Sequence, residues 1–172
     1  VQTCALPIFF SLLTTGSPNN YTDSGTCGIN FGFMRAQNSS QKKVMNVFEI
    51  GSDIENIVLI NTILNNENFE FTTLLIVLDF DNPISQLNYL LKVVSYLRKI
   101  FLKTIDNNII ESNIKNKIAL YPSGIKPNEV DVFPLETYLI GNKYDIIEKI
   151  DIEKLKWLCP SLRYFSYINA LN

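Results

Sequence analysis

The apolar positions of this chain fall into segments with the spacing of strands. Residues 29–34 ("INFGFM") and 43–50 ("KVMNVFEI") have the composition of strands, and a polar turn is predicted between them at 37–41. Residues 72–80 ("TTLLIVLDF") are apolar without alternation, which is typical of a central parallel strand covered on both faces. Residues 135–141 ("LETYLIG") predict a further strand.

Helical spacing follows the second and third of these segments. Ser52 and Glu55 form a capping-box signature, and apolar residues continue from Ile54 to Leu64 at helical spacing. The strongest helix is predicted after Pro83, with Lys92, Lys99 and Lys103 on a face separate from its apolar stripe. The positions predicted for that stripe are Leu87, Leu91, Val94, Leu97, Phe101 and Ile105.

Two more segments complete this pattern. Residues 106–132 contain Asn, Pro and Gly and predict a long connection with at most one short helix. The chain is predicted to be helical from Asp151 onward, and Pro160 predicts a kink or a restart of that helix.

The order of the elements predicts a parallel sheet. Strands that alternate with helices form βαβ units with right-handed crossovers, so 72–80 and 135–141 should be adjacent parallel strands flanked by helices. In such sheets ligands bind beyond the carboxyl ends of the strands. Residues 142–145 lie at one such end.

Composition narrows the classes of function. A chain of 172 residues is long enough for one domain with a sizeable core, and a net charge of −2 gives no overall attraction to nucleic acid or acidic membranes. Histidine is absent, which excludes Ser-His-Asp catalysis, Cys-His catalysis and any His-ligated metal. Cys4, Cys27 and Cys159 form no CxxC pair and are expected to be reduced thiols of a cytosolic protein.

The first residues have unusual features. Residues 5–13 form an apolar run without a basic leader, a weak signal-peptide pattern that is too short to span a bilayer. The opening "VQTCALPI" resembles the translation of a sequencing adapter. Residues 1–8 are therefore predicted to be a non-native leader, and residues 9–172 the domain proper.

Asn142, Lys143, Tyr144 and Asp145 have the form Asn-Lys-x-Asp, which guanine-nucleotide-binding proteins use to read the base. Asp145 can accept two hydrogen bonds from the N1–H and amino group of guanine, a donor pair that adenine does not present. Asn142 can tie the loop to its surroundings and reach the base, and the stem of Lys143 can lie over the purine while its ammonium stays hydrated. The alternative is a chance match, because only three positions are fixed.

The phosphate-binding part of such a site is missing from the sequence. A phosphate loop requires GxxxxGK[ST], and none of the seven glycines is followed by lysine. A DxxG switch does not fit "FEIGSD" either: Phe48 takes the place of the aspartate before Gly51, and Ser52 takes the place of the glycine if Glu49 is the acid. As it stands, the chain is not expected to be a working GTPase.

Several segments together resemble the light intermediate chain family of cytoplasmic dynein 2, the motor of retrograde intraflagellar transport. The family has a Pro-Leu-initiated strand, a Gly-x-Lys-Tyr-Asp loop, a Glu-Lys-rich helix with a Cys-x-x-Leu-Arg-Phe-like segment, and earlier Trp-Glu-Leu-Gly and Val-Leu-Val-Leu-Asp-Leu-Ser-Lys-Pro segments. The matching segments here are Pro134-Leu135, Gly141 to Asp145, Glu153-Lys154, Cys159 to Tyr164, "FEIG" and "LLIVLDFDNP", and "INFGFMR" resembles the family's Tyr-x-Tyr-Gly-Arg strand. The matches lie in the family's order, and Pro160, Ser52 and the missing phosphate loop depart from it.

The resemblance implies a three-layer α/β/α Ras-like P-loop NTPase fold with a mostly parallel sheet, truncated at both ends. Residues 9–172 would be a partial Ras-like G domain without the phosphate loop and the last strand. The guanine-binding residues Asn142, Lys143 and Asp145 would then be vestigial or conditional. No cofactor is expected for this chain, and GTP or GDP with magnesium only if the missing loop is intact in the full protein.

The function that the resemblance implies is that of a non-catalytic accessory subunit. It would bind and stabilise the dynein 2 heavy chain, together with other dynein 2 subunits, for retrograde intraflagellar transport and cilium assembly. The expected location is the cytoplasm, the cytoskeleton and the cilium, with its axoneme and basal body. The alternative is a fragment of a small Ras- or Rab-like GTPase that binds and hydrolyses GTP, which an intact upstream phosphate loop would keep open.

Two surface features have alternative interpretations. The basic face of Lys92, Lys99 and Lys103 could contact a partner, although a solvated helix face is favoured. Aromatic residues could anchor an interface, but burial in the core is favoured for Trp157. The other aromatic candidates are left open: Tyr89, Tyr96 and Tyr164.

Overall fold

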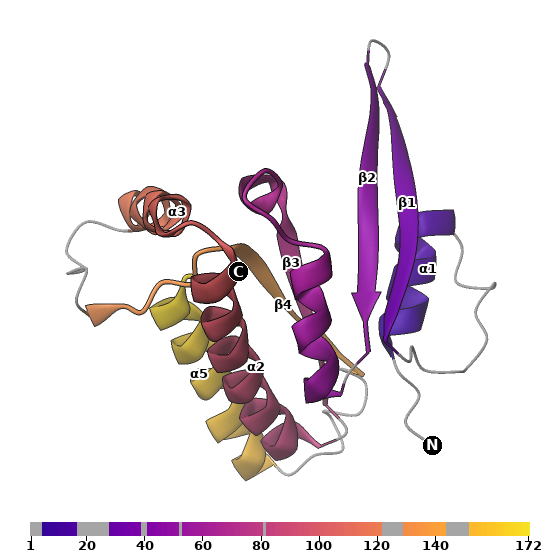
Figure 1. The fold of residues 1–172 in the computed structure, drawn as a ribbon. Coiled ribbons are helices and arrows are strands. Elements are labelled where there is room, and N and C mark those ends of the chain that lie inside the picture. Colours follow the sequence, from indigo (N-terminus) through magenta and orange to yellow (C-terminus); the bar gives the residue numbers. More distant parts are fainter. Residues whose placement is uncertain are drawn as a thin grey trace. The chain divides into compact units, whose positions relative to one another are not determined.

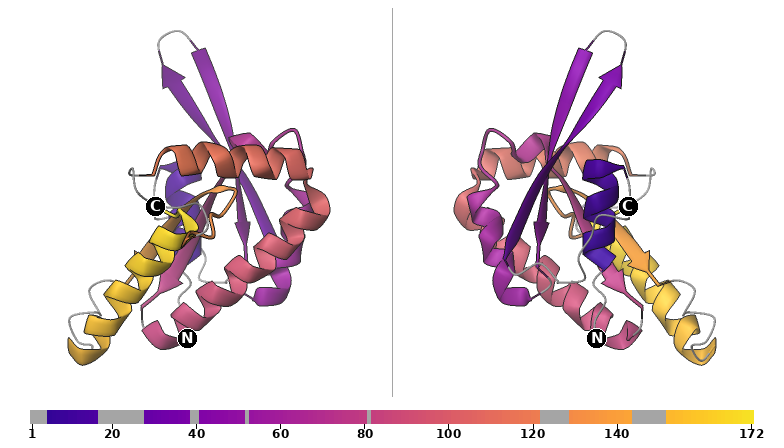
Figure 2. Two further views of the ribbon diagram at one scale, coloured as in Figure 1. Left: turned by 90° about the vertical axis from the view of Figure 1, so that its left-hand side faces the viewer. Right: turned by 90° about the vertical axis from the view of Figure 1, so that its right-hand side faces the viewer.

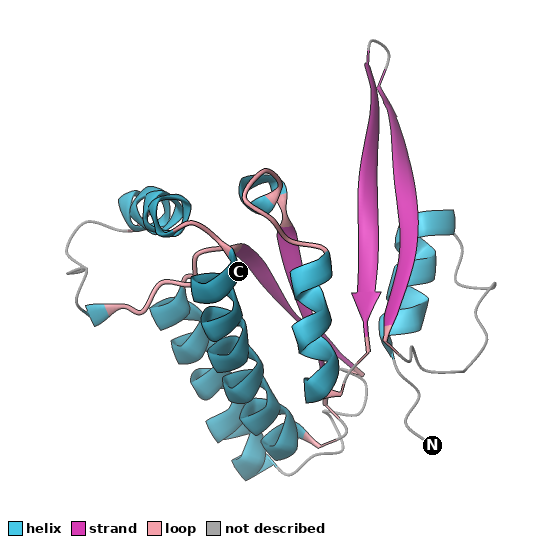
Figure 3. Ribbon diagram, viewed as in Figure 1, coloured by secondary structure: helices cyan, strands magenta, loops and turns pink. Residues whose placement is uncertain are grey.

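The structure is a computed structural model that describes seven stretches of the chain. They are residues 5–16, 28–38, 41–51, 53–80, 82–121, 129–143 and 152–172. The chain forms two compact units, residues 1–62 and residues 63–172, and each is described by itself. Figure 1 gives the element labels, and Figure 3 separates helices from strands.

The first unit contains an antiparallel hairpin. Its strands, β1 (Ile29–Asn38) and β2 (Gln41–Ile50), place Phe31 opposite Phe48 with their ring centroids 5.0 Å apart. Both predicted strands are confirmed, but the polar turn predicted at 37–41 is too long. Backbone pairing continues to Asn38 and Gln41, because ladder hydrogen bonds do not depend on the polarity of the side chains.

A helix packs against this hairpin. Helix α1 (Ala5–Thr15) lies beside β1 in Figure 1, and Gly32 of β1 lets the two backbones approach closely. A Cβ atom at Gly32 would stand 2.6 Å from Cγ2 of Thr14 and 2.8 Å from Cζ of Phe10. Within the described stretches, every helix is too short or too polar to cross a lipid bilayer.

The segment after β2 is a 3₁₀ helix, η2 (Ile54–Thr62), where the sequence predicted helical spacing with a capping box. Ile57 and Ile60 are buried while Val58 is exposed. The three-residue spacing of the buried pair fits a 3₁₀ helix, in which residues three apart share a face. Ser52, the predicted cap, lies outside the described residues.

The second unit is built on two parallel strands. β3 (Thr73–Asp79) and β4 (Glu136–Asn142) pair in parallel, with Ile76 opposite Leu139, so the predicted adjacency and direction are confirmed. In β3, Ile76 and Leu78 are buried, and the other residues are half-buried or exposed. In the described part of the chain this sheet has two strands. The central position of β3 and the three-layer arrangement therefore remain predictions.

The other edge of β4 also has a backbone partner. The amide of Asn172 donates to the carbonyl of Thr137 (2.9 Å), and the amide of Leu139 donates to the carbonyl of Asn172 (2.8 Å). These two bonds have the pattern of a parallel bridge opposite Tyr138. Within a strand, the N–H and C=O of one residue point to the same edge, and successive residues point to opposite edges. The carbonyl of Asn142 faces β3, where it accepts from Phe80, so Thr137 and Leu139 face the other edge. β4 therefore has a backbone partner on both edges.

Two long helices lie on one face of this sheet. α2 (Pro83–Thr104) and α5 (Ile152–Asn169) pack against each other, and the views in Figures 1 and 2 place both on the same side of β3 and β4. The amide of Ser85 donates to the side chain of Asn82, which caps α2, and Pro83 occupies the first turn, where its missing N–H has no cost.

The buried face of α2 is only partly the predicted one. Val94, Leu97 and Phe101 are buried as predicted, and Ile105, just past the helix, is buried as well. Leu87 is only half-buried and Leu91 is 48% exposed, so the first half of the predicted stripe is wrong. The chain is almost continuously apolar from residue 87 to 97, so several stripes fit the same period. The further buried residues are Leu90, Val93 and Ile100.

The connection predicted for 106–132 contains one helix, as expected, but the helix is not short. α3 (Asn107–Ala119) has 13 residues, and the amide of Asn108 donates to a side-chain oxygen of Asp106 at its start (2.9 Å). A short 3₁₀ turn, η3 (Phe69–Phe71), precedes β3. Residues 122–128 lie outside the described part of the chain.

Helix α5 bears on two predictions. It continues through Pro160, so the predicted restart is wrong, while the predicted kink stays a prediction. Trp157 is not in the core, because 79% of it is exposed. Tyr164 is 67% exposed and Tyr96 is 46% exposed, while Tyr89 is half-buried.

Three phenylalanines form the centre of the second unit. Phe101 of α2 packs edge-on against Phe69 of η3 at 5.2 Å between ring centroids, and against Phe133 at 5.5 Å. All three are at most 1% exposed. Burying such rings is the largest stabilising contribution that the described contacts offer.

Arg98 of α2 joins three parts of this unit around that core. It forms an ion pair with Asp131 (3.0 Å), donates to the carbonyls of Asp131 and Val132, and donates to Oδ1 of Asn169 in α5 (2.8 Å). Its guanidinium also lies 5.4 Å from the ring centroid of Phe133. Burial lowers the pKa of Arg98, and the nearby Asp131 opposes that change.

Lys117 of α3 has a similar joining role. Its ammonium donates to the carbonyls of Leu135 (2.7 Å) and Ala170 (3.2 Å) and lies 3.7 Å from a carboxylate oxygen of Glu136. Burial lowers the pKa of Lys117, while Glu136 opposes the shift. Arg98 and Lys117 thus bond carbonyls of the segment that leads into β4, and Lys117 also bonds the carbonyl of Ala170 just after α5.

Replacing Arg98 with Met should destabilise the second unit by about 2 kcal/mol, because several partly buried acceptors lose their donor. The exposed neighbour provides the control: Lys99→Met should change the free energy of unfolding by less than about 0.5 kcal/mol. Urea unfolding of the two variants measures the difference. Equal stability of both variants would show that the Arg98 contacts contribute nothing net.

Candidate functional site

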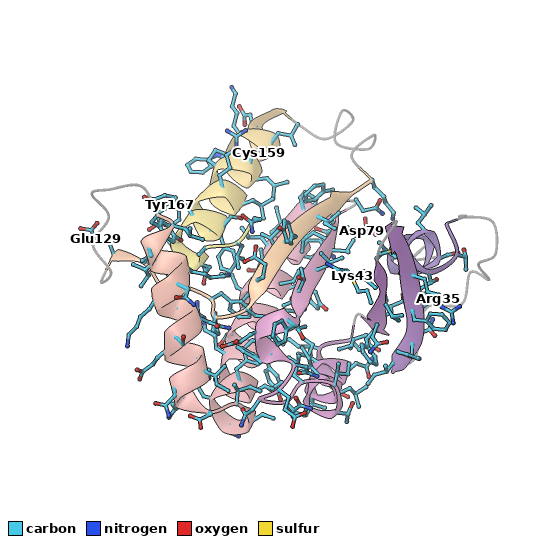
Figure 4. All side chains as sticks on the ribbon, turned by 90° about the horizontal axis from the view of Figure 1, so that it is seen from above. Arg35, Lys43, Asp79, Glu129, Cys159 and Tyr167 are labelled. Carbon is cyan, nitrogen blue, oxygen red and sulfur yellow. The ribbon has the colours of Figure 1, made fainter. Side chains whose placement is uncertain are left out.

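The parallel pairing of β3 and β4 brings the ends of both strands to one edge. Asp79, the last residue of β3, is paired with Asn142, the last residue of β4. The amide of Phe80 donates to the carbonyl of Asn142 (3.3 Å), which carries the pairing one residue further. The base-reading motif therefore begins where ligand sites of parallel sheets lie, and Asp79 is labelled at this edge in Figure 4.

Lys143 turns toward the neighbouring strand. Its ammonium forms an ion pair with Oδ2 of Asp79 at 2.8 Å, and the two side chains are only 17% and 28% exposed. The sequence predicted that this ammonium stays hydrated while the stem lies over a bound purine; in this structure it is paired with Asp79, and the arrangement with a purine stays a prediction. The backbone of Lys143 is left-handed (φ 59°), a conformation that costs a residue with a Cβ about 1 kcal/mol.

The α2 helix also contributes to this edge. The amide of Asp79 donates to Oε1 of Gln86 in the first turns of α2 (3.3 Å). Gln86 in turn is positioned by the start of the helix, where its amide donates to the carbonyl of Asn82 (3.1 Å). The carboxylate that receives Lys143 thus belongs to a residue held by both the strand and the helix.

Gly141 packs directly against the ring of Phe80. A Cβ atom at Gly141 would stand 2.1 Å from Cε2 and 2.6 Å from Cζ of Phe80, closer than any real contact. Phe80 is 8% exposed and cannot leave this position without uncovering the core. The glycine that opens the Gly-Asn-Lys sequence is therefore required by packing.

The predicted site residues are only partly placed. Asn142 ends β4 and Lys143 follows it in the arrangement above, whereas Asp145, the predicted reader of guanine, lies outside the described residues, as does Tyr144. Guanine binding by these residues stays a prediction. Sequence reasoning missed Asp79, although an acidic residue at the carboxyl end of an apolar strand was a visible signal for it.

The segment compared with a magnesium-binding switch lies in the first unit. Glu49 is 4% exposed on β2, and the side-chain amide of Asn30 donates to its Oε2 (3.4 Å). Among the residues that the structure describes, its Oε1 has no hydrogen-bond partner. Across the described residues, no three Asp, Glu, Cys or His side chains gather closely enough to hold a metal ion.

Comparison with solved structures defines the class of fold. The crystal structure of the dynein light intermediate chain's conserved domain superposes with a TM-score of 0.69, covering 95% of this chain and 60% of that chain at 12% sequence identity. The chain therefore has the mixed α/β fold of that domain. No protein-family model matches the chain.

Comparison with curated proteins points to a particular light intermediate chain. Cytoplasmic dynein 2 light intermediate chain 1 is 24% identical in human, 26% in cattle and 23% in zebrafish, covering 80%, 73% and 80% of this chain. These matches confirm the resemblance predicted from the sequence: over most of its length the chain is similar to dynein 2 light intermediate chains. It spans about two fifths of their length, 41% for the human protein.

A double-mutant cycle should detect the contact between Lys143 and Asp79. Lys143→Met and Asp79→Asn should each destabilise the second unit, and together should cost about 1 kcal/mol less than their sum, because the first change already removes the pair. Urea unfolding of the wild type, both single variants and the double variant gives this coupling. Simple additivity would mean that the ion pair does not hold the loop.

Proposed function

We propose that this chain is part of a non-catalytic light intermediate chain of cytoplasmic dynein 2. Its role is to bind and stabilise the dynein 2 heavy chain, alongside the other subunits of the motor, in retrograde intraflagellar transport and cilium assembly. The similarity to proteins of that name over 80% of the chain supports this proposal most directly. The proposed location is the cytoplasm, the cytoskeleton and the cilium, including its axoneme and basal body.

The Ras-like domain serves in this proposal as a scaffold with a three-layer α/β/α core. The parallel pair of β3 and β4, with α2 and α5 on one face, supports that arrangement. The backbone bridge at Asn172 supports a further parallel strand beside β4. Helices on the opposite face would complete the layers in the full protein.

The domain is proposed to act without nucleotide chemistry. The sequence lacks GxxxxGK[ST], so the backbone cradle, the lysine and the magnesium-binding hydroxyl of a phosphate site are all missing. The lysine of the Asn-Lys-x-Asp motif is paired with Asp79. Both observations favour a vestigial base loop at Asn142, Lys143 and Asp145.

The second candidate is a small Ras- or Rab-like GTPase. The observation in its favour is the position of Asn142 and Lys143 at the carboxyl end of a parallel strand, where a base reader belongs. This candidate requires an intact phosphate loop in the upstream part of the full protein. GTP or GDP with magnesium would be its cofactor.

Titration of the full-length protein with labelled GTP and magnesium distinguishes the two candidates, because the GTPase candidate requires the upstream phosphate loop. We expect no affinity in the micromolar range and no hydrolysis above buffer, because Asp145 alone cannot replace the phosphate contacts. Asp145→Ala is the matched variant and should change nothing measurable. Tight binding that this variant abolishes would support the GTPase candidate.

Affinity purification tests the subunit role. Tagged full-length protein should recover the dynein 2 heavy chain, and its depletion should make transport particles accumulate at ciliary tips, because the motor that returns them is destabilised. Mass spectrometry and fluorescence microscopy give the two readouts. Recovery of a vesicle-membrane effector in place of the heavy chain, with normal cilia on depletion, would contradict the proposal.

A further inference from the structure

The outer face of α5 carries an exposed aromatic stripe. We define this α5 stripe by its spacing along the helix, three, four and three residues, which is the a–d–a–d spacing of a helix that packs against another helix. Its exposed fractions are 79% for Trp157, 67% for Tyr164 and 49% for Tyr167, and Pro160 is exposed as well. The stripe consists of Trp157, Pro160, Tyr164 and Tyr167.

The opposite side of α5 already fills the core of the second unit. Leu158, Phe165 and Asn169 are buried there, and Asn169 accepts from Arg98 of α2. These residues are related by the helical repeat and lie about half a turn from Tyr167. The α5 stripe is thus a second apolar face of this helix, separate from the face that is already packed in the core.

The C-terminal end of the stripe is held in place. The Tyr121 hydroxyl donates to the carbonyl of Tyr167 (2.6 Å), and the two rings meet edge to face with centroids 5.9 Å apart. Burial raises the pKa of Tyr121, so this hydroxyl remains a proton donor at neutral pH. A docking surface that is already ordered loses little side-chain entropy on binding. Figure 4 labels Tyr167 and Cys159 on this helix.

The charges beside the stripe indicate what would cover it. Lys156 and Arg163 are exposed, seven residues apart, and each directly precedes a stripe aromatic. In paired helices this position lies at the edge of the contact, where it meets opposite charges of the partner. Glu153 is exposed four residues before Trp157, in line with the stripe, and the two cations follow the stripe along one side.

We propose that the α5 stripe docks an amphipathic α-helix of the dynein 2 heavy chain that presents apolar side chains at heptad spacing and carboxylates beside them. The assignment to the heavy chain rests on the proposed function. Trp157 and Tyr164 are the anchors, since Trp, Tyr and Arg dominate the binding energy of protein interfaces. Lys156 and Arg163 pair with the carboxylates and set the register of the two helices.

The anchors are tested in full-length tagged protein with the native heavy chain. The double variant Trp157→Ala/Tyr164→Ala should reduce recovery of the heavy chain at least about tenfold relative to wild type. The matched control is Phe71→Ala, which removes an aromatic ring that is 87% exposed elsewhere in the second unit and should leave recovery unchanged. Thermal unfolding of the purified variants confirms that they are folded.

Reversing the charge of two exposed residues gives a second, independent measurement of heavy-chain recovery. Lys156→Glu/Arg163→Glu should weaken recovery and flatten its dependence on salt, because the attraction to carboxylates is lost. Lys92→Glu/Lys99→Glu makes the same change in net charge on the exposed face of α2 and is the control. Equal losses in both pairs would show a general effect of charge and overturn the docking proposal.

The outcomes separate this proposal from the proposed function. If wild-type protein does not recover the heavy chain, the subunit role fails and this assignment fails with it. If wild type and the Trp157→Ala/Tyr164→Ala variant recover it equally, the subunit role stands and the stripe is not the docking surface. If two differently tagged copies co-purify through Trp157, the stripe joins copies of this protein, which also overturns the proposal.

Discussion

Parallel pairing of β3 and β4 is the constraint on which the second unit depends. Two parallel strands cannot be joined by a tight turn, so α2 and α3 must cross between them. The core rings that meet beneath that crossover are Phe69, Phe101 and Phe133. Arg98 and Lys117 donate hydrogen bonds to carbonyls of the irregular chain segments. The same pairing sets Asp79 beside Asn142, so the candidate site is a consequence of sheet direction.

The sequence predicted the direction and order of these strands because the apolar runs are long and bounded by clear turn residues. It failed where several apolar residues are consecutive, as around Leu90 and Leu91, because more than one helical face then fits. It also failed for Trp157, since apolar size favours burial only while the helix has one apolar face. The pairing of Lys143 with Asp79 was missed although the two strands were predicted to be neighbours, because it also depends on their register and on the left-handed backbone of Lys143.

The described residues of the candidate site are held by contacts within the chain. In the described residues the positive charge of Lys143 is neutralised within the chain, and Gln86 and Phe80 secure both strand ends. These contacts are made by the chain itself and need no ligand, so the strand ends and Lys143 can hold this arrangement without a nucleotide.

The contact between Gly141 and Phe80 has a consequence for the history of such domains. If a lineage stops binding nucleotide, selection on the base-contacting side chains relaxes, but selection on Gly141 continues, because any side chain there would collide with a core ring. Residues of a ligand-binding motif would therefore be substituted at different rates, depending on their role in packing. In such a lineage a surviving Gly-Asn-Lys would carry less information about present-day ligands than about packing.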